Sequence, residues 1–159
     1  MDICQQLLTM PGELQHLLGQ FPVSRHHWEP KSWDGIAAEK FSVAGQICHL
    51  LDIEVLGYQQ RFHRTLCESY PQLASLDGYQ LAKQNCYRNR QPEQVLEQFA
   101  QARSDTVKLL QSLAAADYAR SAHYAAYGRV TLKGLVHLLR SHDLQHLASM
   151  HWLLMRAEA

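Results

Sequence analysis

Residues 131–156 read TLKGLVHLLRSHDLQHLASMHWLLMR, and this stretch has the clearest helical pattern in the sequence. At about 100° per residue, apolar residues and two histidines project onto one side of a helix. This side consists of Leu135, Leu138, Leu139, His142, His146, Ser149 and Leu153. Thr131 follows Gly128 and marks the expected start, so we predict a helix from Thr131 to about Arg156.

Three further segments show the same periodicity. The first covers about residues 2–20 and is interrupted at Pro11, which suits the first turn of a restarted helix. The second runs from Ser42, a suitable N-cap, to about Glu68, and the third starts at Pro92. The last three helices span on the order of 30 to 40 Å each. Helices of such similar length pack side by side, so we expect an all-α fold, a four-helix bundle.

The predicted helices are joined by long connections, residues 22–41, 69–91 and 117–130, which are rich in Trp and Tyr. Loops of this length without structure are uncommon in compact domains, so we expect ordered crossovers anchored by aromatic rings. No segment shows sustained period-two alternation, and no strands are expected. The sequence also shows no internal repeat or linker, which predicts one domain over residues 1–159.

Composition limits the classes of binding partner and the cellular compartment that we expect for this chain. Fifteen basic and fifteen acidic residues cancel without clustering, which argues against nucleic acid and anionic membranes as partners. The four cysteines show no CxxC or zinc-ribbon spacing, and a chain of 159 residues does not need disulfides. The N-terminal residues lack the features of a secretion signal, and no segment predicts a membrane span. We therefore expect a cytoplasmic protein.

His142 and His146 form an HxxxH pair on the predicted last helix. Four residues advance a helix by about 400°, so both imidazoles stand on one face and can hold one metal ion. With ten histidines in the chain such a pair also arises by chance, and the alternative is two core histidines hydrogen-bonded to loop groups. Their place in the apolar stripe favours metal, because two buried imidazoles without a partner are costly. His137 and His151 project to the opposite side and are expected on the surface.

A third ligand is expected from the second helix. His49 lies there on a stripe with Gly45, Ile53, Leu56 and Gln60. His63 shares this face but lies about 20 Å further along, so only one of the two can join the pair. Periodicity alone does not decide between them.

Two motifs carry a resemblance to a known family. Residues 41–54, FSVAGQICHLLDIE, resemble the WSxxEvxxHLxDxE signature of the DinB/YfiT superfamily, with Phe41 for the usual Trp and Gly45 for the usual acidic residue. Residues 141–150, SHDLQHLASM, resemble its closing HDxxHxxQI motif and end in Ser-Met in place of Gln-Ile. The likeness extends over most of the chain.

The resemblance implies a four-helix bundle with a long crossover between the second and third helices. It also implies a divalent metal ion at His49, His142 and His146. Three imidazoles leave a coordination position open, as in catalytic zinc sites, and nickel, iron and manganese also accept imidazole ligands. Relatives include bacillithiol transferases, mycothiol-dependent maleylpyruvate isomerases and metal-dependent hydrolases, and many of them form homodimers.

Four residues near these motifs have other interpretations. Asp52 projects to the edge of the His49 face, which allows a fourth ligand, a general base, a carboxylate that supports a ligand, or a solvated carboxylate. Glu54 and Arg103 are each expected in a structural ion pair. Cys48 points about 100° away from His49 and is expected in the core.

We therefore expect a metal-dependent enzyme whose three-histidine site activates a low-molecular-weight thiol or water, as an S-transferase or hydrolase acting on a small molecule. One alternative is a non-catalytic metal-binding or stress-response protein of the same fold. The other is a helical interaction module without metal. The sequence identifies no catalytic side chain beyond the ligands.

Overall fold

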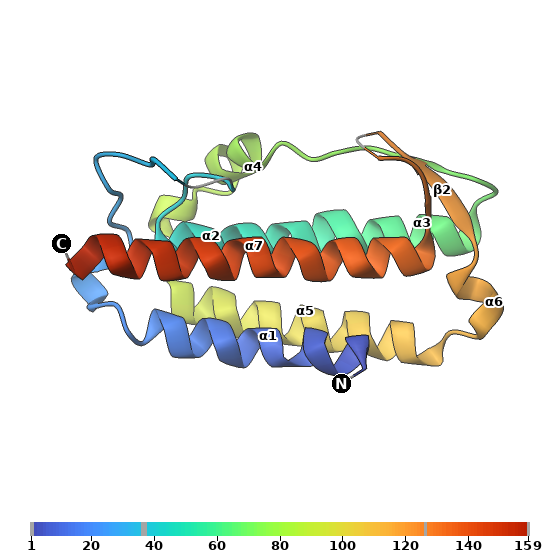
Figure 1. The fold of residues 1–159 in the computed structure, drawn as a ribbon, viewed down its shortest axis with the longest axis horizontal. Helices are drawn as coiled ribbons and strands as arrows, with labels where there is room; N and C mark the ends of the chain where they lie inside the picture. Colours follow the sequence, from blue (N-terminus) through green and yellow to red (C-terminus); the bar gives the residue numbers. More distant parts are fainter. Residues whose placement is uncertain (1, 36–37, 126, 159) are drawn as a thin grey trace.

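Four long helices form the body of the molecule in a computed structural model, which describes residues 2–35, 38–125 and 127–158. They are α1 (Ile3–Leu18), one continuous helix made of α2 (Val43–Asp52), η2 (Ile53–Tyr58) and α3 (Gln59–Cys67), then α5 (Pro92–Ser112) and α7 (Leu132–Glu158). Both α5 and α7 pack against α1 and against the α2–α3 helix. Figure 1 shows α2, α3 and α7 in one layer, with α1 and α5 in the other. The predicted four-helix bundle is confirmed.

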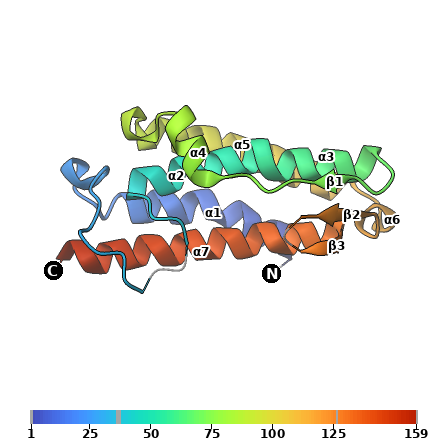
Figure 2. The ribbon, with the colours of Figure 1, turned by 90° about the horizontal axis from the view of Figure 1, so that it is seen from above.

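The long connections carry structure of their own. Because α3 and α5 run in the same direction, the chain returns along the bundle between them, and Figures 1 and 2 show this crossover over the α2–α3 side. The short elements outside the bundle are η1 (Val23–Arg25), β1 (Gln72–Leu73), α4 (Gly78–Gln84), η3 (Tyr87–Asn89), α6 (Ala115–Tyr118), β2 (Ser121–Tyr124) and β3 (Gly128–Thr131). The predicted connections also include residues 36–37 and 126, which lie outside the described residues.

A small sheet contradicts the expectation that the chain has no strands. Its order is β1-β2-β3, with β1 parallel to β2 and β2 antiparallel to β3. Leu73 pairs with Tyr124, which joins the crossover to the hairpin that precedes α7. The strands have two or four residues each, so no alternating pattern is long enough to reveal them.

Pro11 does not interrupt the first helix, contrary to the sequence-based expectation. It lies inside α1, where it cannot donate the usual hydrogen bond to the carbonyl of Leu7, four residues earlier. That carbonyl instead accepts a hydrogen bond from Nη1 of Arg103, at 3.3 Å. A tertiary contact thus satisfies the backbone group that the proline leaves free.

The second helix contains a π-helical segment, η2, that shifts its inward face. The regular period predicts Leu56 and Gln60 on that face, but both are exposed. Gly57 and Arg61 are buried in their place, because a π turn accommodates one extra residue. The predicted stripe is therefore correct as far as Ile53 and wrong after it.

A buried ion-pair cluster joins all four long helices at Arg103. Its guanidinium, on α5, donates two hydrogen bonds to Asp143 of α7, at 2.6 and 2.8 Å. A third goes to Glu54 of η2, at 2.9 Å, and the bond to Leu7 adds α1. Each predicted structural ion pair, of Arg103 and of Glu54, is confirmed, and the two residues pair with each other.

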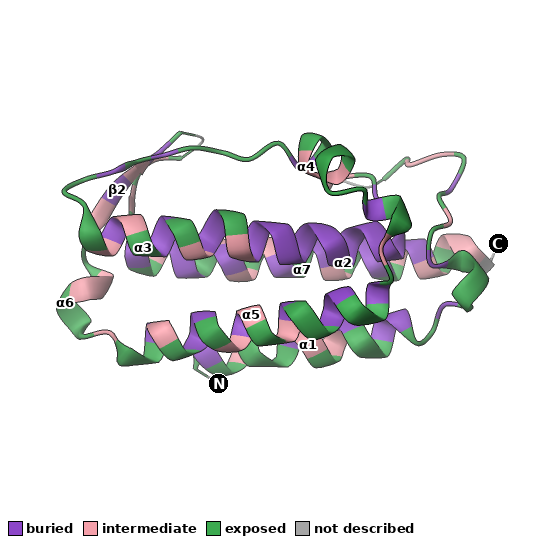
Figure 3. Ribbon diagram, turned by 180° about the vertical axis from the view of Figure 1, so that it is seen from behind, coloured by how far each residue is buried: buried purple, intermediate pink, exposed green. Residues whose placement is uncertain are grey.

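Helix α2 is covered on all sides, and each of its ten residues is buried. The bundle lies on one side of it and α4 and η3 on another, and Figure 3 shows the ribbon of α2 in the colour of buried residues. Among the described residues, no helix is both long enough and apolar enough to cross a membrane. A side chain on α2 is thus held away from bulk water, which sets the environment of His49.

Candidate metal centre

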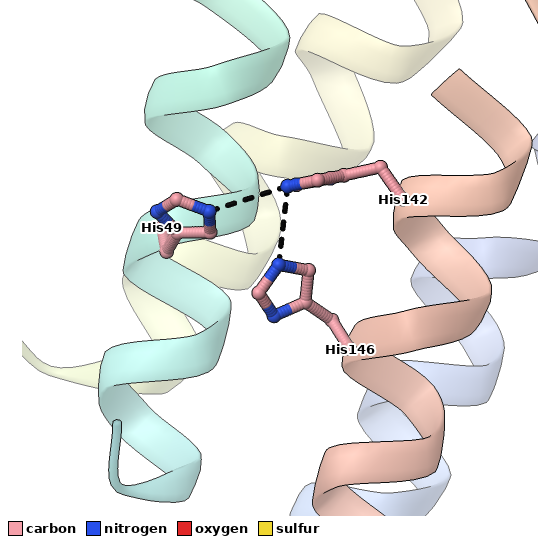
Figure 4. A group of neighbouring side chains, drawn as sticks. All are labelled: His49, His142 and His146. Carbon is pink, nitrogen blue, oxygen red and sulfur yellow. Dashed lines mark hydrogen bonds between the residues drawn. The ribbon is translucent and has the colours of Figure 1, made fainter. Parts of the chain in front are cut away.

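Three histidines from two helices converge in the bundle interior. Nε2 of His142 lies 3.2 Å from Nε2 of His49 and 3.1 Å from Nε2 of His146. Figure 4 shows the three rings, one from α2 and two from α7, turned toward a common point. All three ligand atoms lie within 4.8 Å of one another. The structure thus selects His49 as the partner of the HxxxH pair, whereas His63 is exposed.

Gln46 fixes the orientation of His146. Its Nε2 donates hydrogen bonds to the backbone carbonyls of Glu39 and Phe41, both at 3.1 Å. Its Oε1 therefore faces Nδ1 of His146, which donates the proton of this hydrogen bond. With the proton on Nδ1, the lone pair of His146 is on Nε2 and points at the other two rings.

Glu39, which the sequence analysis did not single out, brings a carboxylate to the cluster from the connection before α2. Its oxygens lie 3.7 Å from Nε2 of His49 and 3.7 Å from Nε2 of His146. The side chain is one-third exposed, so it stands between the buried rings and the opening. A lone carboxylate in a loop carries no periodic signal, and only the fold places it here.

The backbone at the start of α4 lies close against the ring of His49. Gly78, the first residue of α4, lies so near that a Cβ would be 2.8 Å from Cε1 and 3.1 Å from Nδ1 of His49. Such distances are shorter than van der Waals contact, so a side chain here would displace the ring or the helix. The glycine allows α4 to cover His49.

Burial keeps the three imidazoles neutral. It lowers the pKa of His142 to about 3, and the electrostatic interactions with His49 and with the cations Arg103 and Arg61 lower it as well. Burial also lowers the pKa of His49 and of His146, although nearby carboxylates oppose the shift at His49. Neutral imidazole is the form that binds metal.

The donor set fits a divalent cation. Neutral rings with Nε2 atoms 3.1 and 3.2 Å apart can share a proton across a pair, but one proton cannot satisfy three nitrogens. In a tetrahedral zinc site with Zn–N bonds of 2.0–2.1 Å, two nitrogens lie about 3.4 Å apart, close to the distances found here. Nδ1 of His49 and Nδ1 of His142 are buried without a hydrogen-bond partner among the described residues. No hydrogen bond at Nδ1 therefore turns either ring away from the cluster.

A cavity of about 200 Å³ opens on one side of the cluster. His49, His142 and Glu39 reach it from the metal side, and Tyr58, Arg61 and Tyr124 line it from η2, α3 and β2. The shift of the inward face in η2 brings Arg61 here, and the β1–β2 pairing brings Tyr124. Regular helical periodicity gives no signal for either residue.

The other candidate residues lie away from the cluster. Asp52 is buried and accepts hydrogen bonds from Tyr87 (2.6 Å) and Asn85 (2.7 Å), so a solvated carboxylate is wrong and a metal ligand is not supported. Cys48 is fully buried, as predicted, and burial raises the pKa of its thiol to about 12, unlike that of a nucleophile. His137 and His151 are exposed, as predicted.

Comparisons with known proteins agree with this architecture. The model of the DinB superfamily matches residues 6–150. One similar solved structure is YfiT from Bacillus subtilis, described as "a probable metal-dependent hydrolase with an unusual four-helix bundle topology". It is 20% identical, with a TM-score of 0.84 over 98% of this chain and 86% of the YfiT chain, a likeness of fold. No curated protein sequence matches this chain.

Proposed function

The chain belongs to the DinB superfamily, and from this premise we propose that it is a metal-dependent enzyme whose ion is held by His49, His142 and His146. The observation that carries the proposal is the convergence of three neutral imidazoles, two buried and that of His142 half-buried, beside a cavity. A buried site with three protein ligands and an open side is the arrangement of catalytic rather than structural zinc. Zinc is our first choice, and nickel, iron and manganese accept the same ligands.

The residues around the cluster have separate tasks in this proposal. Gln46 holds the tautomer of His146 that presents Nε2. Gly78 and α4 exclude water from the back of His49. Glu39 faces the nitrogens from the opening and can accept a hydrogen bond from a water or thiol that enters there. A bound divalent ion lowers the pKa of such a water or thiol toward neutrality.

We propose a small-molecule substrate, because the cavity volume equals that of roughly seven water molecules. Both hydrolysis and transfer to a low-molecular-weight thiol fit these dimensions. The YfiT likeness favours hydrolysis. The resemblance of residues 41–54 and 141–150 to a superfamily that includes thiol transferases favours transfer. Assays of ester or amide hydrolysis and of thiol conjugation with the same electrophiles separate the two.

The site is tested by replacing each ligand. We expect His49→Ala, His142→Ala and His146→Ala each to lower the metal content by at least tenfold while helical content is largely kept, because apolar stripes hold the bundle together. Elemental analysis and circular dichroism of the purified variants measure both. His137→Ala is the matched control, since this exposed histidine lies on the same helix as two ligands. Equal metal content in all four variants and the wild type would contradict the proposed three-histidine metal site.

A further inference from the structure

Arg61 is a buried cation that has no counterion within residues 2–35, 38–125 and 127–158. Its side chain is almost fully buried, at 5% exposure, and no carboxylate lies within 4.0 Å of it among the described residues. Nη2 donates a hydrogen bond to the carbonyl of Ala74, at 3.3 Å, and Nε is buried with no partner in the part of the chain that the structure describes. The other buried arginine, Arg103, pairs with two carboxylates. A buried charge left unpaired is costly, so its retention points to a partner that arrives from outside.

Two aromatic rings, a glycine and a backbone carbonyl surround the guanidinium of Arg61. Its carbon lies 5.0 Å from the ring centroid of Tyr58 and 4.7 Å from that of Tyr124, so two aromatic rings partly offset the loss of water. Gly57 leaves room for it, since a Cβ there would lie 2.9 Å from Nη1 of Arg61. The Ala74 carbonyl is positioned next to β1, whose Leu73 pairs with Tyr124. Three elements thus converge on one side chain.

Arg61 shares the cavity with the metal candidates. The lining that holds Arg61 also holds His49, His142 and Glu39. The hydroxyls of Tyr58 and Tyr124 form no hydrogen bond to any other described residue, so both are free to bind a guest in the cavity. One end of a small guest can therefore meet the histidine cluster while the other meets the guanidinium.

We propose that Arg61, with Tyr58 and Tyr124, binds a carboxylate group of the substrate and so directs the rest of the molecule to the histidine cluster. A planar guanidinium with free N–H groups matches a carboxylate, and the pair forms charge-assisted hydrogen bonds. The cavity has room for a small acid and not for a long chain. This assignment of substrate class rests on the proposed function, but the anion site itself can be tested without metal.

The test compares two ligands of nearly the same shape, one ending in a carboxylate and the other in an uncharged amide. Zinc-loaded protein is titrated calorimetrically with 3-mercaptopropionate and with 3-mercaptopropionamide, which share a thiol for the ion. We expect the wild type to prefer the acid by about 10- to 100-fold, the range of a hydrogen bond to a charged group, and Arg61→Met to lose the preference. The matched control is Arg64→Met, which should keep the preference for the acid. Arg64 lies one turn further along α3, is exposed and pairs with Glu68.

A second measurement separates the anion site from the metal site. The melting temperature of metal-free protein is recorded with propionate, propionamide or inorganic phosphate. We expect propionate alone to raise it in the wild type and in Arg64→Met, and no ligand to raise it in Arg61→Met. Arg61→Met should itself melt no lower than the wild type, because it removes an unpaired buried charge. Arg61→Lys, which keeps the charge without the planar fork, should retain only part of the preference.

These outcomes decide the proposal. An unchanged acid preference in Arg61→Met and Arg61→Lys would overturn it, as would a phosphate response larger than that of propionate. A strong loss of stability in Arg61→Met would make the arginine structural and also overturn it. If the wild type holds no zinc, the proposed function fails, and the metal-free comparison still decides the role of Arg61.

Discussion

At the scale of single residues, the histidine cluster links protonation to stability. Burial lowers the pKa of His142 to about 3 and also lowers those of His49 and His146, whereas a histidine in an unfolded chain titrates near pH 6.5. Between about pH 6.5 and 3 the unfolded chain therefore binds more protons than the folded protein. Stability rises with pH wherever this holds, so acidification below pH 6.5 must destabilise the metal-free protein.

We accordingly expect the free energy of unfolding of metal-free protein to fall by about 2 kcal/mol between pH 7 and pH 5 from His142 alone. Urea unfolding at the two values measures it. In loaded protein, protons compete with the ion for the same nitrogens, so excess metal should shift metal loss to lower pH. The double variant His137→Gln, His151→Gln alters only exposed rings, so its curve of metal content against pH should coincide with that of the wild type. If the free energy of unfolding of the metal-free wild type is the same at pH 7 and pH 5, the histidine cluster is not neutral as described.

Gly78 offers a second test on the scale of one residue. In Gly78→Ala the new Cβ would lie 2.8 Å from Cε1 of His49, so we expect the ring to shift and the metal affinity to fall by about tenfold. Competition with a chromophoric chelator measures the affinity. Gly12→Ala is the control, because a Cβ at Gly12, in helix α1, meets nothing within 4 Å. Equal affinities in the two variants would show that the backbone of α4 does not hold His49 in place.

At the scale of an element, η2 behaves as a one-residue insertion into a regular helix. Without it, α2 and α3 would form one α-helix with the same inward faces at both ends. We therefore expect deletion of Leu56, an exposed residue of η2, to leave the protein folded and nearly as helical. Circular dichroism and thermal unfolding measure this.

The matched deletion is that of Glu97, an exposed residue of α5, which contains no π segment. Removing it rotates the helix beyond it by about 100° and turns part of its apolar face to water, so this variant should unfold. If both deletions are equally harmful, η2 does not act as an insertion.

At the scale of the whole molecule, Arg103 joins the four long helices at one buried point. Arg103→Met would leave the carboxylates of Glu54 and Asp143 buried without their cation. We expect a loss of about 3 to 5 kcal/mol in the free energy of unfolding, as for other buried ion pairs that lose one partner. Chemical denaturation measures it, and Arg64→Met, whose pair with Glu68 is exposed, should change little. A small effect of Arg103→Met would mean that apolar packing alone holds the bundle.

The sequence by itself determined what depends on neighbours a few residues apart. The positions of the long helices follow from apolar periodicity, and the shared face of His142 and His146 follows from four-residue spacing on one helix. The outward position of His137 and the buried position of Cys48 follow from the same geometry. Local spacing alone also gave a wrong result, because Pro11 was expected to break a helix that continues.

Only the tertiary structure decided what depends on residues distant in the chain. The choice of His49 over His63, the approach of Glu39 and the close packing of Gly78 each require the connections to fold over α2. The inward turn of Arg61 requires the π segment, and the strands exist only through their mutual pairing. The physical reason is that helix periodicity is a local property, whereas a binding site is formed where separate segments meet, at distances that spacing along the chain does not fix.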